Sequence, residues 1–150
     1  MLFYEDMTPG ESITSPTAVV DRDEMVAFAK RWDPMPFHVD DAAGQAAFGG
    51  ITAPGLFVLA IKQQLIHQLP DQHAVIASLG YDELRFHAPV CPNDTLHLKF
   101  ECISRRESKT KADRGVVTVR LSLINQAGVT VMSHLDTILV RRRNPRANLE

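Results

Sequence analysis

Apolar positions in the first half of the chain recur with a helical period. Asp21 can cap a helix, and Glu24 follows it by three residues, as in a capping box. Four apolar residues then keep the i, i+3, i+4, i+7 spacing of one buried helix face: Met25, Phe28, Ala29 and Trp32. Pro34 is expected to end this helix and to push Asp33 out of the α region, because the residue before a proline clashes in that conformation.

Two more helices are predicted before the midpoint of the chain. The first is short, covers residues 40–47 and ends before the glycine pair at 49–50. The second starts after Pro54 and runs from residue 55 to about residue 69. Its first turns, residues 56–61, are apolar on every side, so we expect them to be buried all round. Only beyond Lys62 does the pattern become amphipathic.

In the second half the apolar period changes from helical to alternating, which predicts β-structure. Strands are expected over five ranges: 75–79, 83–90, 95–102, 117–123 and 129–140. Gly80 is read as a break between the first two. The segment 125–128, which reads Asn-Gln-Ala-Gly, is typical of a hairpin turn.

A buried helix followed by long antiparallel strands predicts an α+β fold in which the sheet curls around the helix. All 150 residues fit one domain. An open sheet leaves an edge strand that needs covering, and pairing across a two-fold axis is the common solution, so we expect a homodimer. The basic segment 141–150 is expected to be a solvated, flexible tail.

Composition changes this picture little. The chain is 45% hydrophobic and 23% charged, and its net charge of −2 gives no electrostatic case for binding nucleic acid or membranes. Cys91 and Cys102 form no metal-ligand spacing and are expected to be free thiols in a reducing compartment. The first residues lack the cationic and apolar pattern of a signal peptide. We therefore expect a cytoplasmic protein.

The loop after the first helix carries the main candidates for chemistry, and it reads Asp33-Pro34-Met35-Pro36-Phe37-His38. At a helix C-terminus the macrodipole disfavours an anion by roughly 0.3–1 kcal/mol, so an aspartate there calls for a reason. Two prolines fix the path of the loop and hold Asp33 and His38 at a defined separation, as acid–base catalysis requires. Taken alone, the spacing favours a solvated aspartate and a half-buried histidine without a catalytic role.

A second candidate lies at the start of the long helix. The first amides of a helix have no partner inside it, and the dipole is positive at that end. Gly55 has no side chain, so a substrate carbonyl can approach its N–H, while Pro54 is well suited to begin a helix. The pair predicts an oxyanion hole, although a well-started helix would need the same residues.

Together these segments resemble the MaoC-like, (R)-specific enoyl-CoA hydratases. The resemblance spans nearly the whole chain and rests on these motifs: Asp33-Pro34-Met35-Pro36-Phe37-His38-Val39-Asp40, Phe48-Gly49-Gly50-Ile51, Pro54-Gly55-Leu56, Tyr81-Asp82-Glu83-Leu84-Arg85-Phe86, Pro89-Val90 and Pro92-Asn93-Asp94-Thr95-Leu96. It implies a hot-dog fold, in which a curled sheet wraps a central helix. It also implies addition of water to a 2-enoyl thioester, or the reverse reaction, without metal, flavin or nicotinamide.

By this resemblance Asp33 and His38 are the catalytic pair, and the N–H of Gly55 polarises the thioester carbonyl. The resemblance further implies four substrate-binding residues: Phe37, Gly50, Pro54 and Leu56. The substrate would be an acyl thioester of coenzyme A, and the sequence does not distinguish this carrier from an acyl carrier protein. Arginines suited to the coenzyme phosphates are numerous: Arg85, Arg105, Arg106, Arg114 and Arg141–Arg143.

Three positions depart from the family pattern: Met35 stands for an asparagine, Pro54 for a histidine and Ala60 for a serine. They leave two alternatives open. A hot-dog thioesterase would also use a carboxylate and a helix amide, but its carboxylate usually lies on the central helix, and here the first acid after Gly55 is Asp71. The other alternative is a non-catalytic subunit that binds an acyl thioester.

Overall fold

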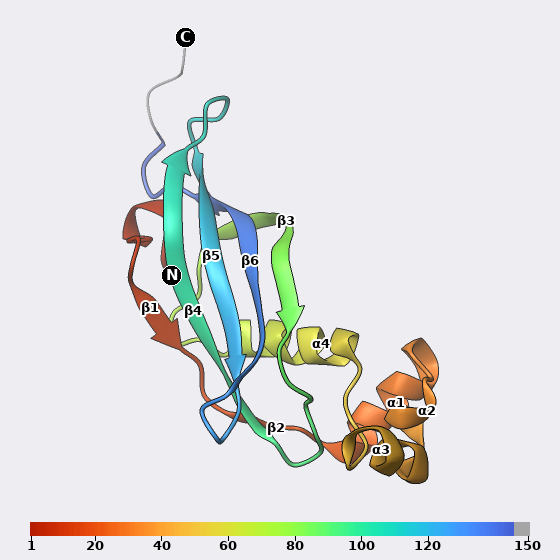
Figure 1. The fold of residues 1–150 in the computed structure, drawn as a ribbon. Helices are drawn as coiled ribbons and strands as arrows, with labels where there is room; N and C mark the ends of the chain where they lie inside the picture. Colours follow the sequence, from red (N-terminus) through yellow and green to blue (C-terminus); the bar gives the residue numbers. More distant parts are fainter. Residues whose placement is uncertain (146–150) are drawn as a thin grey trace.

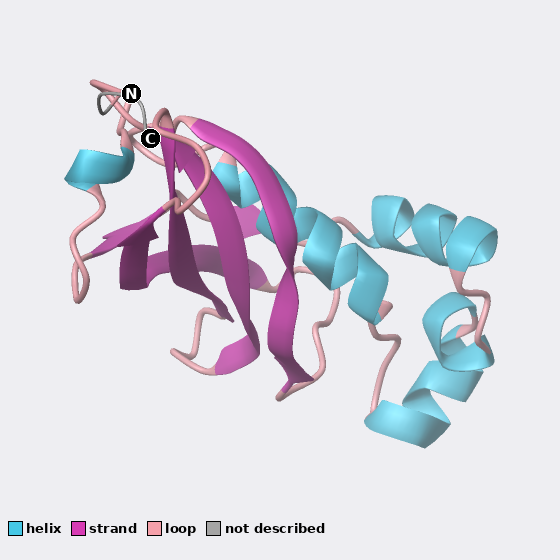
Figure 2. Cartoon of the chain, turned by 90° about the horizontal axis from the view of Figure 1, so that it is seen from above, coloured by secondary structure: helices cyan, strands magenta, loops and turns pink. Residues whose placement is uncertain are grey.

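In the computed structural model, which describes residues 1–145, an antiparallel sheet curls around one long helix (Figures 1 and 2). The helical elements are η1 (Tyr4–Asp6), α1 (Arg22–Trp32), α2 (Pro36–Val39), α3 (Asp41–Phe48) and α4 (Gly55–Ile66). The strands are β1 (Ser12–Thr14), β2 (Ala18–Val19), β3 (Val75–Phe86), β4 (Thr95–Glu107), β5 (Arg114–Ile124) and β6 (Thr130–Arg141). The predicted α+β class and the central helix are confirmed.

The sheet has the order β1-β4-β5-β6-β3, with β2 pairing to β4 off this path. Its four long strands are antiparallel neighbours, and β3 forms one edge. Along β4 the predicted alternation is confirmed, because Leu96, Leu98, Phe100 and Cys102 are buried while the residues between them are less so. These side chains face α4, which lies across the concave face of the sheet (Figure 2).

The three short helices α1–α3 gather beyond one end of α4 (Figure 1). Their predicted caps are confirmed: Asp21 accepts a hydrogen bond from the Glu24 N–H at 2.8 Å, and Gly49 ends α3 with φ +74°. The predicted burial of Trp32 is wrong, since this residue is 59% exposed. It lies on the last turn of α1, where the guanidinium of Arg31 covers its ring at 4.7 Å.

Helix α4 is not buried on every side, contrary to the prediction. Leu56 is 57% exposed and Ala60 is exposed, while the opposite face packs on the sheet. Helix α4 ends at Ile66, three residues earlier than expected, because a tighter turn follows in which the His67 N–H donates to the Gln64 carbonyl. Lys62, after which the helix was predicted to become amphipathic, is only 1% exposed.

The predicted break at Gly80 is also wrong. Strand β3 runs through it as one strand, and register shifts against β6 absorb the irregularity, with Gly80 at φ +149°. The strand ends at Phe86 instead of residue 90, so His87 lies in the loop that follows.

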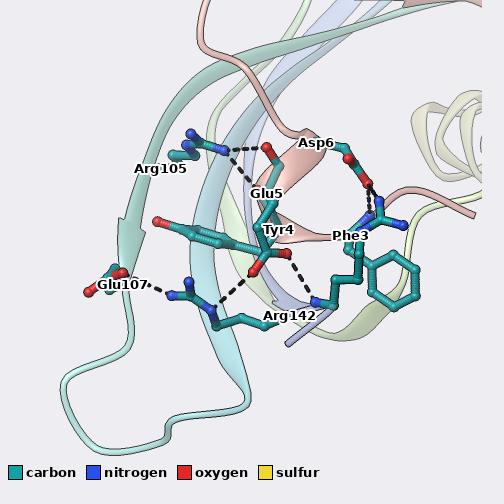
Figure 3. Close-up of polar contacts among 8 residues, drawn as sticks. Phe3, Tyr4, Glu5, Asp6, Arg105, Glu107 and Arg142 are labelled. Atoms are coloured by element: carbon teal, nitrogen blue, oxygen red, sulfur yellow. Dashed lines mark hydrogen bonds and ion pairs between the residues drawn. The ribbon is translucent and has the colours of Figure 1, made fainter. Parts of the chain in front are cut away.

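The segment after β6 is held against the N-terminus (Figure 3). The Arg142 guanidinium pairs with Glu5 at 3.1 Å and Glu107 at 2.9 Å, and Arg143 donates to Asp6. The expectation of a solvated tail is therefore wrong for Arg142, whose side chain is 14% exposed. The part of that prediction that concerns residues 146–150 falls outside the described residues.

Other sequence-based expectations concern single features. Cys91 and Cys102 are both free thiols, as predicted. Among residues 1–145, no helix has the length and apolar character that a membrane span needs. His134 lies in the last strand, β6.

Candidate active site

The loop between α1 and α2 is fixed by backbone hydrogen bonds as well as by its prolines. The Asp33 N–H donates to Ala29, the Met35 N–H to Asp33 and the His38 N–H to Met35, each at 2.9 Å. Asp33 has φ −155° and ψ 73°, outside the α region, as the following proline predicts. The chain therefore leaves α1 at Asp33 and re-enters a helix with His38 on its first turn.

The structure brings Asp33 and His38 together. Asp33 Oδ2 lies 3.7 Å from His38 Nε2, and the aspartate side chain is 38% exposed while the histidine side chain is 10% exposed. His38 Nδ1 lies 2.7 Å from the Thr52 carbonyl oxygen. Because a carbonyl only accepts, Nδ1 carries the hydrogen, and Nε2 of the neutral ring faces Asp33 as an acceptor.

The separation of the two groups is longer than a direct hydrogen bond. It suits two groups that share one water, since a polar contact beyond about 3.5 Å is commonly bridged in this way. A carboxylate and an imidazole nitrogen on either side of a water can take a proton from it and return one.

Gly55 begins α4, with Pro54 at the N-cap. Within residues 1–145 its N–H donates to no acceptor, whereas the N–H groups of Phe57 and Val58 donate to the Pro54 carbonyl. A Cβ on Gly55 would lie 2.7 Å from the ring of Phe86, closer than side chains pack. The position therefore favours glycine and presents a free backbone donor.

His38 and Gly55 line one cavity of about 410 Å³, which we term the Gly55 cavity. Of the residues predicted to bind substrate, Phe37 lines this cavity. Pro54 is buried beside it as the cap of α4. Gly50 and Leu56 are not among its lining residues: the Gly50 N–H donates to Gly44, and Leu56 is largely exposed.

Several lining residues were not predicted as site residues: Phe48, Thr52, Ala53, Val58, Phe86, His87, Ala88, Pro89 and Val90. The Thr52 carbonyl orients the imidazole of His38. The sequence signal for Thr52 as a site residue is its position two residues before Pro54. Phe86 and His87 arrive from the end of β3, so no local pattern could have found them. His87 is oriented by Ser133, with Nε2 at 2.8 Å from the hydroxyl oxygen.

Comparison with known proteins gives a family match that covers most of the chain. The family model of the MaoC like domain matches residues 5–127. Uncharacterized protein YdeM of Bacillus subtilis is 30% identical over 140 residues, which cover 92% of this chain and 98% of that protein. Mesaconyl-CoA hydratase of Cereibacter sphaeroides is 40% identical over 72 residues, but these cover 48% of this chain and only 21% of the hydratase.

Solved structures agree with the family match. A MaoC-like dehydratase from Rhodospirillum rubrum is 31% identical, with a TM-score of 0.89 and coverage of 96% of this chain and 99% of that one. A conserved hypothetical protein of Mycobacterium tuberculosis described as a double hot-dog fold is 20% identical, with a TM-score of 0.77 over 99% of this chain and 46% of that chain. The second likeness concerns the fold alone, and it confirms the hot-dog architecture.

Proposed function

The chain belongs to the family of MaoC-like dehydratase domains, and we propose that it is a lyase that adds water to a 2-enoyl thioester of coenzyme A or removes it from the 3-hydroxyacyl thioester. One observation carries the proposal: Asp33 and His38 face each other across 3.7 Å, and His38 lines the same cavity as Gly55, whose N–H is unpaired.

In the proposed hydration, the thioester carbonyl accepts a hydrogen bond from the Gly55 N–H. Asp33 and His38 hold one water between them and take a proton from it as its oxygen bonds to the β-carbon. The C=C electron pair moves to give an enolate, whose negative oxygen the Gly55 N–H and the α4 dipole stabilise. The pair then returns one proton to the α-carbon, so its protonation state is restored.

The orientation of His38 supports these roles. Its Nδ1–H is engaged by the Thr52 carbonyl, so only Nε2 is available to exchange a proton with the shared water. His38 is nearly buried, and the aromatic rings of Phe37 and Phe48 stand at the same cavity.

We further propose that the protein works as a homodimer. Strand β3 is an unpaired edge among residues 1–145, and large apolar side chains are exposed along it and on α4: Val75, Leu79, Tyr81, Phe86 and Leu56. An edge strand with exposed apolar neighbours favours pairing with a second copy across a two-fold axis.

Substrate turnover with simultaneous detection of free thiol tests the proposed reaction. The purified protein would be incubated with crotonyl-CoA and with longer and branched 2-enoyl-CoA esters, following loss of the enoyl thioester absorbance. We expect that signal to fall without release of thiol. Release of stoichiometric thiol would instead identify a thioesterase, and no change with any ester would contradict an enzymatic role on this substrate class.

A further inference from the structure

A lysine is buried between α4 and the sheet, away from the proposed catalytic residues. Lys62 is 1% exposed. Its Nζ donates to Gln63 Oε1 at 3.2 Å and to the Tyr81 hydroxyl at 3.0 Å, and it lies 4.5 Å from the centre of the Tyr81 ring. Within residues 1–145 no carboxylate lies within 4 Å of this nitrogen. A buried ammonium is normally paired with an anion, so this one calls for an explanation.

A second buried polar group stands beside it. His134 is 2% exposed, and its ring packs on Tyr81 with centroids 4.3 Å apart. Its Nδ1 lies 3.1 Å from the Leu135 carbonyl, so Nδ1 carries the hydrogen. Its Nε2 is buried and has no hydrogen-bond partner among the described residues. The pKa of His134 is lowered, mainly by burial. The hydrogen bond to the Leu135 carbonyl raises this pKa, and the positive charge of Lys62 lowers it further.

Next to these groups lies a cavity of about 340 Å³, which we term the α4–β3 cavity; Lys62 and His134 themselves are not among its lining residues. Gln63 and Tyr81, the two partners of Lys62, both line it. Asp136 lines it too, and its carboxylate is occupied by the Ser78 hydroxyl at 2.6 Å. The remaining wall mixes apolar side chains, including Ile66 and Phe100, with the polar side chains of His67, Gln72 and His73. The cavity therefore offers both apolar surface for a hydrocarbon chain and polar groups for its far end.

The position of Lys62 relative to Gly55 relates this cavity to the proposed reaction. The two residues are seven apart on α4, which places them on the same helix face and roughly 10 Å apart along the axis. An acyl chain whose thioester oxygen meets the Gly55 N–H, and which follows this face, would bring its far end to Lys62. A four-carbon chain would not reach it, whereas a medium-length chain would.

We propose that the α4–β3 cavity recognises a carboxyl group at the far end of the acyl chain, so that the substrate is a medium-chain dicarboxylic acyl thioester. This rests on the proposed function. One carboxyl oxygen takes the place of Gln63 Oε1 and accepts a hydrogen bond from Lys62 Nζ. The other oxygen accepts a hydrogen bond from the Tyr81 hydroxyl, whose proton has no acceptor among residues 1–145. The carboxyl group also forms a hydrogen bond with His134 Nε2. The proton of this bond resides either on the carboxylic acid or on the imidazole ring, which then becomes an imidazolium.

A carboxyl group that arrives with its proton adds no net charge to the cavity. The exchange at Lys62 is also feasible, since Gln63 is an exposed side chain that can turn back to solvent. A chain that ends in a methyl group would instead leave Nε2 of His134 without a donor.

Calorimetric binding of two saturated esters tests the proposal. Octanoyl-CoA and suberyl-CoA have the same chain length and differ only in their last group, methyl or carboxyl, and neither can be hydrated. We expect the wild-type protein to bind suberyl-CoA at least about tenfold more tightly, as for a buried hydrogen bond to a charged group. Equal affinity, or tighter binding of octanoyl-CoA, would overturn the proposal.

Variants separate recognition from folding. Lys62→Met keeps the length of the side chain, and Tyr81→Phe keeps the ring that packs on His134; each should remove most of the preference for suberyl-CoA and leave octanoyl-CoA binding within a few-fold. Lys109→Met removes an exposed positive charge outside the cavity and should preserve the preference. An equal loss for both esters in Lys62→Met and in Tyr81→Phe would mean that these residues only support the fold.

The outcome is separable from that of the proposed function. A carboxyl preference in binding, combined with no turnover of any 2-enoyl ester, would keep the recognition site and reject the hydratase. Hydration of trans-2-octenoyl-CoA with no carboxyl preference in binding would keep the hydratase and reject the site. Tighter binding of an ω-hydroxyoctanoyl ester than of suberyl-CoA would reject a carboxyl group as the recognised end.

Discussion

At the scale of single residues, the site depends on two backbone groups, one carbonyl and one N–H. The Thr52 carbonyl takes up one nitrogen of His38 and so directs the other toward Asp33. Gly55 contributes because it has no side chain: a Cβ would occupy the space from which a ligand reaches its free N–H. Both effects are backbone effects, and neither changes the composition of the site.

Replacing Gly55 by alanine tests the second effect. The new Cβ would lie 2.7 Å from the Phe86 ring, so the ring must shift, and this ring lines the Gly55 cavity where the thioester is proposed to bind. We expect kcat/KM for 2-enoyl ester hydration to fall about 100-fold, the cost of a misplacement near 1 Å, with the melting temperature little changed. Gly55→Ala/Phe86→Leu should recover part of the loss. Full activity in Gly55→Ala would contradict a role for close approach.

The residues of the site differ in how far sequence could predict them. Asp33 and His38 are placed by local features, a helix end and two prolines, and the structure brings them together as expected. The sequence pattern marks Lys62 only as the residue after which the helix becomes amphipathic, and it does not predict burial, because lysine is rarely buried. Lys62 is buried by Tyr81 and His134, which belong to strands that are distant in the sequence. The local pattern around Lys62 therefore cannot predict its burial.

At the scale of elements, η1 joins the chain's first residues to the end of β6. Burial alone would raise the pKa of Glu5, but the Arg143 N–H and the charges of Arg142 and Arg143 act against it, and the pKa is lowered overall below 4.5. The carboxylate form is thus bound more favourably in the folded protein. Its stabilising effect is present above the ordinary pKa and is lost as pH falls through the folded value.

A pH series of melting temperatures tests this contact. Glu5→Gln should lower the melting temperature at neutral pH, because it removes the charge that pairs with Arg142. The difference from wild type should shrink as the pH falls below the ordinary glutamate pKa and vanish below the lowered folded pKa, where the wild-type carboxylate is neutral too. Glu11→Gln, at an exposed glutamate, serves as the control. A difference that is constant over this range would mean that the charge of Glu5 does not stabilise the fold.

The predicted helix ends are correct where a single residue near the end determines the boundary. Asp21, Pro34 and Gly49 mark helix ends that the structure confirms. The prediction failed where the tertiary environment decides: β3 continues through Gly80 because β6 accommodates its bulges, and α4 leaves one apolar face uncovered by its own chain. Helix α4 reads as fully buried because sequence does not say whether the same chain or another one covers it.

At the scale of the whole molecule, that uncovered face and the open β3 edge lie where a second copy can pair. In Figure 1 β3 forms one edge of the sheet, next to β6, and its lower end lies near α4. A shared interface of this kind would bury exposed apolar side chains from both elements and remove the free edge at once.

Sedimentation analysis of a β3 variant tests the dimer. Leu79 is 59% exposed on this edge strand, and Leu79→Glu should place a charge in the proposed interface and shift the protein from dimer toward monomer. Val129→Glu changes an apolar residue that is 44% exposed beside the β5–β6 turn and should leave the dimer intact. A wild-type protein that sediments as a monomer at micromolar concentration would contradict the homodimer.

The most direct test of the account is the hydration rate of a 2-enoyl-CoA ester by wild type, Asp33→Asn and His38→Ala, with folding checked by circular dichroism. Each substitution removes one of the two groups that hold the water, so we predict that kcat falls at least about 100-fold in both, the usual contribution of a general acid or base. Asp71→Asn, beyond α4, should retain the wild-type rate. Folded variants that hydrate the ester as fast as wild type would show that Asp33 and His38 do not perform the chemistry.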